Sequence, residues 1–326
     1  MMDQITLVDV YAARDRLHGR VRRTPLQASD ALSEVAGVPV YLKLEHQQIT
    51  GSFKLRGATN AVMRLTGEQR ARGVVGVSTG NHGRGLAFAA RAAGIRAIVC
   101  MSELVPKNKV EAIAALGAEV RIAGNSQDDA EVEVQRLVAE EGMTLLSPFD
   151  HPHVIAGQGT LGLEMIEDLP GLDTVVVPLS GGGLLGGVAL TLKTINPGIR
   201  TVGVSMERGP AMVESLRAGK PVFVEEVRTL ADSLGGGIGL DNRYTFGLIR
   251  DFVDETLLVS EAQIAAAIQH AYRHERQIIE GGAAVGMAAL LAGLVKDPGT
   301  TLVLLSGGNI DMHLHQRLIN GEEVAL

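Results

Sequence analysis

One lysine stands where its amine could react with a carbonyl compound. Lys54 lies in "ITGSFKLRGA", directly after Phe53, in a run of small residues that opens an expected helix. The positive end of a helix dipole disfavours a protonated amine, and a lysine that forms a Schiff base must be partly deprotonated at neutral pH. A solvated surface lysine is the ordinary alternative, and Lys54 taken alone does not decide between the two.

A run of glycines could bind a phosphate group. In "TVVVPLSGGGLLGGVALTL" an apolar strand is followed by Gly181, Gly182 and Gly183 and then by a helix. The backbone N–H groups of such a loop and of the helix N-terminus point outward together and attract an anion. A tight turn without a ligand needs one glycine rather than three in a row, so we predict a phosphate site.

The same glycines also match a dinucleotide fingerprint. Gly181, Gly183 and Gly186 have the G-x-G-x-x-G spacing. Glu207 ends the next expected strand about 20 residues on, where an acid would bind a ribose. A nicotinamide-dependent oxidoreductase is therefore one alternative function, and a non-catalytic sensor of a small molecule is another.

Two further strand ends carry polar residues. Asn81 and His82 stand between glycines in "VSTGNHGRG", and Ser306 follows an apolar strand in "TTLVLLSGGNID". Ligands bind at the carboxyl ends of strands in open parallel sheets. Together with the lysine and the phosphate loop, these ends describe a site for a small phosphorylated aromatic aldehyde. For His82 we favour a structural role, packed under its loop, over that of a general base.

The elements that must position these residues alternate between strand and helix. Short β-branched runs such as "GVVGVS", "RAIVCMS" and "RTVGVSM" each precede an alanine-rich or leucine-rich helical stretch. Continuous apolar strands of this kind predict an α/β fold with open parallel sheets covered by helices on both faces. We expect two such domains, a large one from residues 1–51 and 146–326 and a small one from residues 52–145.

Composition excludes several classes of function. A formal net charge of −7 offers no basic face for nucleic acid. The single cysteine, Cys100, excludes a disulfide framework and a cysteine-based metal cluster, and its apolar neighbours predict a buried structural thiol. Neither a secretory signal nor an apolar run of about 20 residues is present, so we expect a cytoplasmic protein without a membrane partner.

Five motifs in this order resemble the fold-type II pyridoxal-phosphate enzymes, and among them the threonine dehydratase and serine racemase family. The resemblance runs from "RVRRTPLQASDALS" through "VYLKLEHQQITGSFKLRGA" and "VIAGQGTLGLEM" to "SGGNID". It implies a tryptophan synthase β-like fold, pyridoxal 5'-phosphate as cofactor and an amino-acid substrate. It further implies elimination of water from a 3-hydroxy amino acid to give a keto acid and ammonia, and a homodimer.

The resemblance also assigns roles to residues of this chain. Lys54 would hold the cofactor covalently and move the α-proton of the substrate, and Ser306 would face the pyridine nitrogen. The expected cofactor-binding residues are Phe53, Lys54, Asn81, Gly181, Gly182, Gly183, Leu184, Leu185, Glu280 and Ser306. The expected substrate-carboxylate loop, which the small and mobile domain would carry, consists of Ser78, Thr79, Gly80, Asn81 and His82.

Departures from the family pattern narrow the expected activity. Serine racemases carry a serine where this chain has Thr79, so dehydration is favoured and a racemase-like activity is the alternative. The metal-binding acids of some members are replaced by Ser205 and Ala211, so no metal is expected there.

Two segments resemble one branch of the family in particular. "SMERGPAM" and "LADSLGGGIGLDNRYTF" resemble the hydroxyectoine-utilisation and 3-hydroxyaspartate dehydratases. A substrate with a second carboxylate needs a cation to bind it. The candidates are Arg84, His151, Arg208 and Arg243.

Overall fold

The computed structural model describes residues 4–78, 80–103, 105, 107–125, 127–322 and 324. It divides the chain into two compact units. Unit 1 consists of Met1–Arg22 with Lys54–Gly157, and unit 2 consists of Arg23–Phe53 with Gln158–Leu326. One of the crossings between the units thus lies between Phe53 and Lys54.

These boundaries differ from the expected ones, because the start of the chain and residues 146–157 belong to the smaller unit. The reason lies in α3 (Lys54–Met63), whose Asn60 is fully buried. The Oδ1 atom of Asn60 accepts a hydrogen bond of 2.6 Å from Arg16 in α1 (Leu7–Leu17), and its Nδ2 atom donates one of 2.7 Å to the carbonyl of His153. Both outlying segments are therefore fastened to α3.

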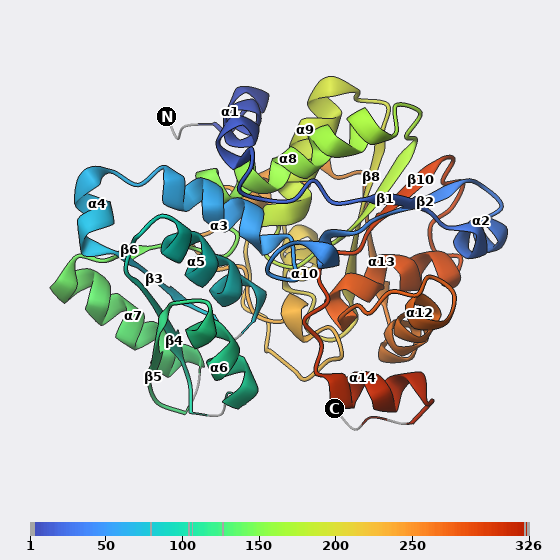
Figure 1. The fold of residues 1–326 in the computed structure, drawn as a ribbon. Helices are drawn as coiled ribbons and strands as arrows, with labels where there is room; N and C mark the ends of the chain where they lie inside the picture. The colour runs from blue at the N-terminus through green and yellow to red at the C-terminus, as the bar shows by residue number, and fades with distance from the viewer. Residues whose placement is uncertain are drawn as a thin grey trace. The chain divides into compact units, whose positions relative to one another are not determined.

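Unit 1 is built on a four-stranded parallel sheet of strand order β5-β4-β3-β6. The strands are β3 (Val74–Val77), β4 (Ala97–Met101), β5 (Glu119–Ile122) and β6 (Thr144–Leu145). The helices are α1, α3, α4 (Gly67–Arg72), α5 (Asn81–Ala92), α6 (Lys107–Ala115), α7 (Gln127–Glu141) and the start of α8 (Pro152–Asp168). Figure 1 shows β3, β4 and β5 in blue-green, next to α5 and α6.

Side chains of β3 and β4 alternate between two cores, as expected of a sheet covered on both faces. Val74 and Val99 pack with Leu86 and Ile113 of α5 and α6, whereas Cys100 belongs to the other cluster with residues of α7. The Cys100 side chain is fully buried, and this burial raises the pKa of its thiol to about 11. Cys100 is thus the buried structural thiol that its apolar neighbours predicted.

Unit 2 is built on a six-stranded sheet of strand order β1-β2-β10-β7-β8-β9. The strands are β1 (Leu26–Ala28), β2 (Val40–Lys43), β7 (Thr174–Pro178), β8 (Arg200–Met206), β9 (Glu255–Val259) and β10 (Thr301–Leu304). All neighbouring strands are parallel except β1, which pairs with β2 in the antiparallel direction. The predicted fold class of two open parallel-sheet domains is confirmed, with one antiparallel strand at an edge.

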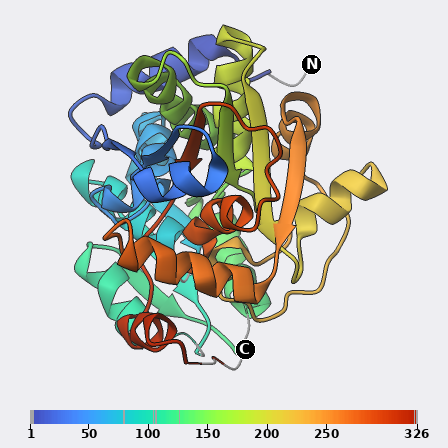
Figure 2. The same cartoon turned by 90° about the vertical axis from the view of Figure 1, so that its right-hand side faces the viewer.

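Helices cover both faces of the unit 2 sheet. Val176 of β7 packs in the cluster of α2 (Asp30–Ala36), α12 (Glu261–Arg273) and α13 (Gly281–Leu291). Its neighbours along β7 pack in the opposite cluster, with α8, α9 (Gly183–Ile195) and α11 (Thr245–Phe252). Figure 2 shows α12 and α13, in orange and red-orange, along one face of the strands.

The remaining helices of unit 2 are short. They are η1 (Glu45–Gln47), α10 (Ala211–Ala218), η2 (Asp232–Leu234) and α14 (Met312–Ile319). Within the part of the chain that the structure describes, no helix has both the length and the apolar composition needed to cross a membrane.

Candidate active site

Two loops of unit 2 that are far apart in the sequence pair with each other. The backbone N–H of Phe53 donates to the carbonyl of Ser306 over 3.0 Å, and that of Gly308 donates to the carbonyl of Gly51 over 2.9 Å. Gly51 has φ +77°, and a Cβ atom there would lie 2.5 Å from Oδ1 of Asn309. Ser306, two residues beyond the end of β10 and only 4 % exposed, is thereby placed next to Phe53.

Glu280 lies against the same loop. It is the N-cap residue of α13, it is 5 % exposed, and its N–H donates to the carbonyl of Gly307 over 3.1 Å. One carboxylate oxygen accepts a hydrogen bond of 3.2 Å from the N–H of Asn309. Glu280 is thus held against the loop that follows Ser306, within unit 2.

The glycine loop follows β7, the strand that pairs with β10, so it leaves the sheet at the same edge as the Ser306 loop. Gly182 has φ +85°, and a Cβ atom there would lie 2.9 Å from Cε of Met212 and 3.0 Å from Cβ of Thr245. Helix α9 begins at Gly183, and the first N–H groups of a helix have no acceptor within it. The hydroxyl of Ser180 donates to the carbonyl of Leu234 over 2.9 Å, which fixes the start of the loop.

The side chains of Leu184 and Leu185 are buried in the core of unit 2, so this loop offers a ligand its backbone rather than its side chains. Such a loop in front of a helix N-terminus is a cradle for an anion. Gly186, the third glycine of the dinucleotide spacing, has another explanation. A Cβ atom there would lie 3.2 Å from Cβ of Leu248, because α9 packs closely on α11.

In unit 1, Lys54 is the first residue of α3, and its side chain is partly buried. Its Nζ donates to the carbonyl of Pro148 over 2.8 Å. A Cβ atom at Gly85 of α5 would lie 3.2 Å from both the carbonyl carbon of Lys54 and the N atom of Leu55. The glycine therefore lets α5 touch the main chain of Lys54.

The loop before α5 is held by its own serine. The Oγ of Ser78 accepts hydrogen bonds from the N–H of Gly80, at 3.3 Å, and of Gly83, at 2.9 Å. Asn81 and His82, the first residues of α5, are buried. Thr79, on which the choice between dehydratase and racemase rests, lies outside the described residues. Unit 1 thus places Lys54 at the start of α3 and Asn81 and His82 at the start of α5, and these two helices are in direct contact.

His82 is neutral at physiological pH. Burial, the positive charge of Lys54 and the nearby His151 lower its pKa to about 3, against the opposing effect of a bond to the carbonyl of Leu146. The distance from Nε2 to that oxygen is 2.9 Å. A carbonyl only accepts hydrogen bonds, so we assign the single ring proton to Nε2. This geometry supports the structural role favoured for His82.

The four candidate cations differ in their burial and in their charge. Arg84 is partly buried in α5, and Arg208 and Arg243 are exposed. Burial and the neighbouring His153 lower the pKa of His151 to about 4, although Asp150 opposes the shift. The neutral form of His151 is therefore favoured at pH 7, so the three arginines are the stronger candidates for the cation.

The two positions expected to replace metal-binding acids are both buried. Ser205 has its Oγ 3.5 Å from the sulfur of Met206, and Ala211 opens α10. Among the described residues, no group of three or more His, Cys, Asp or Glu side chains has the arrangement of a metal site.

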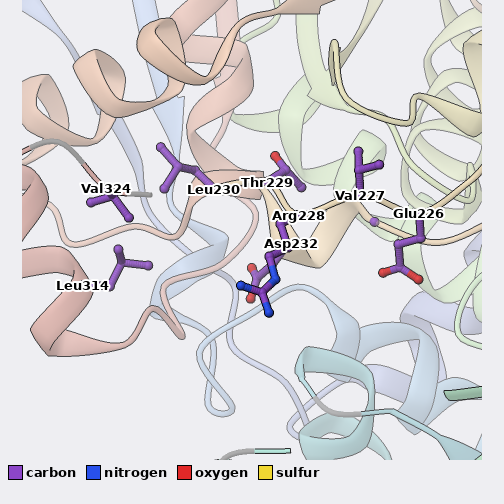
Figure 3. Close-up of a pocket in the computed structure, with 9 residues that line it drawn as sticks. Glu226, Val227, Arg228, Thr229, Leu230, Asp232, Leu314 and Val324 are labelled. Carbon is purple, nitrogen blue, oxygen red and sulfur yellow. The ribbon is translucent and has the colours of Figure 1, made fainter. Parts of the chain in front are cut away.

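Unit 2 also has a cavity of about 490 Å³ that sequence reasoning did not foresee (Figure 3). Its lining residues are Glu226, Val227, Arg228, Thr229, Leu230, Asp232, Gly235, Leu314 and Val324. Glu261 holds one wall, because its carboxylate accepts from the hydroxyl of Thr229 at 2.6 Å and from the N–H of Leu230 at 2.7 Å. Neither Lys54 nor the glycine loop lines this cavity, so it is not the candidate active site.

Comparison with known proteins decides between the interpretations of the glycine loop. A family model described as pyridoxal-phosphate dependent enzyme matches residues 17–307. The chain belongs to the pyridoxal-phosphate dependent enzymes. The nicotinamide alternative loses its basis, since the residues that suggested it lie within this match and Gly186 is accounted for by helix packing.

Two bacterial relatives cover nearly all of this chain. A Sinorhizobium fredii protein, provisionally named threonine dehydratase, is 57 % identical over 321 residues and covers 98 % of this chain and 97 % of its own. The L-threonine ammonia-lyase of Thermotoga maritima is 43 % identical over 316 residues, which are 97 % of this chain and 78 % of that protein. The chain is thus an enzyme whose relatives bear the names of lyases.

Solved structures agree with this family. Maize serine racemase superposes with a TM-score of 0.91 at 32 % identity, with 97 % of each chain covered. The processed form of threonine deaminase isoform 2 from Solanum lycopersicum superposes with a TM-score of 0.88 at 34 % identity and covers 96 % of this chain and 87 % of its own.

The residues present suit the family's cofactor. The cradle at Gly182, which a Cβ atom would fill, can take a phosphate, and the amine of Lys54 can take an aldehyde. The sequence did not single out Gly85 and Pro148, which contact Lys54 in unit 1, or Asn309, which contacts Glu280 in unit 2. The glycine in "GNHGRG" and the asparagine in "SGGN" were visible signals, but nothing in the sequence marked the carbonyl of Pro148.

Proposed function

We propose that this enzyme is a dehydratase that eliminates water from a 3-hydroxy amino acid and releases a keto acid and ammonia. The observation that carries the proposal is the bond from Phe53 to Ser306, because it places the residue before Lys54 beside a buried serine at the end of β10. The names of the threonine dehydratase and ammonia-lyase relatives support it.

In this proposal each expected residue has one role toward the cofactor or the substrate. Lys54 binds the cofactor covalently, the loop from Gly181 to Leu185 binds its phosphate, and Asn81 binds the hydroxyl of its ring. Phe53 packs against the ring, Ser306 faces the ring nitrogen, and Glu280 stands close by. The loop Ser78–His82, with Thr79 included, binds the substrate carboxylate through backbone N–H groups and short side chains.

Bound pyridoxal phosphate withdraws electrons from the Cα atom of an amino acid joined to it, so the α-proton becomes acidic. Lys54, once its amine is released by the incoming substrate amine, takes that proton. The β-hydroxyl would then take up a proton and leave as water, which balances the proton that Lys54 removed from the α-carbon. Return of the Lys54 amine to the cofactor would free the product as an enamine, which tautomerises to an imine and is hydrolysed by water to a keto acid and ammonia. Ser306 offers the ring nitrogen a hydroxyl rather than a carboxylate, so the nitrogen stays unprotonated and the ring withdraws electrons less strongly. This favours elimination over reactions that need a long-lived carbanion.

For the substrate we propose 3-hydroxyaspartate ahead of threonine and serine, with a role in hydroxyectoine degradation as the wider context. The support is the resemblance of "SMERGPAM" and "LADSLGGGIGLDNRYTF" to that branch. Of the cation candidates, Arg84, Arg208 and Arg243 are the stronger ones for the second carboxylate, because the neutral form of His151 is favoured at pH 7. A racemase-like side activity depends on Thr79 and stays an alternative.

Assembly and location are part of the same proposal. We propose a homodimer in the cytoplasm, with unit 2 as the cofactor-binding domain and unit 1 as the mobile domain that binds the substrate carboxylate. The resemblance to the family supports the homodimer. Light scattering of the purified enzyme tests it, and a monomeric mass at micromolar concentration contradicts it.

The deciding experiment measures keto acid and ammonia released from L-serine, L-threonine and the threo and erythro isomers of 3-hydroxyaspartate. Wild type is compared with Lys54→Ala and with Lys220→Ala, a matched change at an exposed lysine of unit 2. We expect Lys54→Ala to lose the near-visible absorption of the bound cofactor and to lower kcat by about 10²–10⁴-fold or more, and Lys220→Ala to keep both.

Each outcome assigns the substrate differently. Faster turnover of 3-hydroxyaspartate than of threonine supports the branch and requires a cation in the pocket. Faster turnover of threonine or serine identifies a general dehydratase and removes the branch assignment. If wild type binds the cofactor but releases no ammonia from any of the four compounds, the dehydratase proposal fails for these substrates.

A further inference from the structure

Helix α5 contacts both Lys54 and the segment that carries the acceptor of its amine. Gly85 touches the main chain of Lys54, since a Cβ atom at Gly85 would lie only 3.2 Å from the carbonyl carbon of Lys54. His82 lies three residues earlier, on the same face of the helix, and its Nε2 lies 2.9 Å from the carbonyl of Leu146. Two residues after Leu146 comes Pro148, whose carbonyl accepts from Nζ of Lys54 at 2.8 Å.

The segment from Leu146 to Pro148 has few conformations open to it. The N–H of Leu146 donates to the carbonyl of Val75 over 3.1 Å, which extends the pairing of β6 with β3 by one residue. The Oγ of Ser147 accepts from the N–H of Asp150 at 3.1 Å and closes a tight turn. The ring of Pro148 fixes its own φ and restricts Ser147 to extended backbone. These restraints limit how far the Pro148 carbonyl can move once the Leu146 carbonyl is held.

His82 can hold that carbonyl because it keeps one N–H donor. It is 4 % exposed, and burial and the charge of Lys54 keep its ring neutral, with its pKa near 3. A neutral imidazole with its proton on Nε2 satisfies the carbonyl of Leu146 without placing a second positive charge beside Lys54. Removing the donor would leave the carbonyl of Leu146, a buried residue, without this partner.

We propose that His82 is a positioning residue that holds the Leu146–Pro148 segment so that the Pro148 carbonyl receives the Lys54 amine whenever that amine is released. The inference rests on the function proposed for Lys54. During each turnover the amine takes the α-proton and becomes an ammonium group in a partly buried place. The Pro148 carbonyl gives one of its N–H groups an acceptor there, so the amine stays where it can return the proton.

The first test measures acylation of Lys54 by an N-hydroxysuccinimide ester in the full-length chain freed of cofactor, read by peptide mass spectrometry relative to the exposed Lys220. We expect Lys54 to be labelled about tenfold faster in His82→Leu than in wild type, since the charge-assisted hydrogen bond from the Lys54 ammonium to the Pro148 carbonyl is lost. Glutamine places its amide near the position of Nε2, whereas asparagine is too short. His82→Gln should therefore label like wild type, and His82→Asn like His82→Leu.

The second test uses the enzyme with cofactor and separates kcat from KM. We expect His82→Leu to lower kcat about tenfold while KM changes less than about twofold, and His82→Gln to recover most of the loss. A merely structural His82 would lower the melting temperature without moving the labelling ratio. Equal labelling of Lys54 in folded His82→Leu and wild type, or labelling of His82→Gln at the faster rate, overturns the proposal.

A third measurement needs no variant and covers the case in which His82→Leu and His82→Asn do not fold. The ¹⁵N shifts of histidine in wild type at pH 7 should show a neutral His82 with its proton on Nε2. A cationic ring or a proton on Nδ1 overturns the proposal. Because labelling does not require turnover, failure of wild type to release ammonia would refute the proposed function and leave this inference to be judged by labelling alone.

Discussion

Phe53 donates its backbone N–H to the carbonyl of Ser306 over 3.0 Å. This bond joins the end of the loop that leads to Lys54 with the loop that follows β10 of the unit 2 sheet. The two loops also share the bond between Gly308 and Gly51, so residues 51–53 and 306–308 form a short antiparallel pair. Such pairing holds Phe53 and Ser306 at a constant separation and prepares their place in the site.

Gly182→Ala should weaken cofactor binding more than it destabilises the fold. The positive φ costs an alanine about 1–2 kcal/mol, and its Cβ atom would lie 2.9 Å from Met212 and 3.0 Å from Thr245. We expect the Kd for pyridoxal phosphate, measured by fluorescence titration, to rise at least about tenfold. Gly171→Ala, in the same unit with open space around its Cβ, is the control. An unchanged Kd in Gly182→Ala would show that this loop does not bind the phosphate.

Gly85→Ala should reduce turnover by displacing Lys54. The new Cβ atom would lie 3.2 Å from the carbonyl carbon of Lys54 and from the N atom of Leu55, closer than ordinary van der Waals contact. We expect kcat to fall several-fold, because contacts this short force the main chain that carries the reacting amine to shift by a few tenths of an ångström. Gly67→Ala, with nothing within 4 Å of its Cβ, should leave kcat unchanged. Equal kcat in both variants would show that α5 does not position Lys54.

Asn81→Ala should change the absorption spectrum of the bound cofactor. Asn81 is 8 % exposed at the start of α5, and our proposal gives its amide a hydrogen bond to the ring hydroxyl. Loss of one hydrogen bond to a charged ring is worth about 1.5–3 kcal/mol, so turnover should fall by at least an order of magnitude. Circular dichroism should show an intact fold. A variant with the wild-type spectrum and rate contradicts this role.

The pH dependence of stability should carry the signature of His82. In the unfolded chain a histidine takes up a proton as the pH falls below about 6.5, whereas the depressed pKa of about 3 keeps His82 neutral in the folded chain. The unfolded state therefore binds more protons in this window, and stability falls as the pH falls through it. For one group the loss approaches about 1.4 kcal/mol per pH unit.

Urea unfolding of wild type and His82→Gln at pH 7 and pH 5 measures this effect. The free energy of unfolding of wild type should drop more steeply on acidification than that of His82→Gln, which has no titrating ring at this position. His313→Gln, a change at an exposed histidine, should keep the wild-type slope. Parallel slopes in wild type and His82→Gln would mean that His82 is protonated in the folded protein.

Local patterns in the sequence accounted for the sheets and for several of the chemical groups. The apolar strands around Val176 and Val99 lie where their β-branched runs predicted, because a strand buried on both faces leaves a continuous apolar signal. The glycines at 181–183 stood out from their neighbours alone, whereas the role expected of Lys54 came from the other motifs and the family resemblance. Residues that work by such local chemistry can be identified from the order of amino acids.

The protonation state of the histidines, and the unit to which each chain segment belongs, depended on the tertiary structure instead. His151 was a candidate cation by residue type, but burial and the neighbouring His153 lower its pKa to about 4, which favours the neutral form well below pH 7. The start of the chain joins the smaller unit because Asn60 binds Arg16, a contact that no periodicity encodes.

The amino-acid sequence by itself determined the fold class, and it predicted the phosphate loop from the spacing of glycines within one short segment. Only the tertiary structure decided that Phe53 meets Ser306, that the carbonyl of Pro148 receives Lys54 and that His82 is neutral. Hydrogen-bond partners and desolvation are set by segments distant in the chain, and they exist only once the chain has packed.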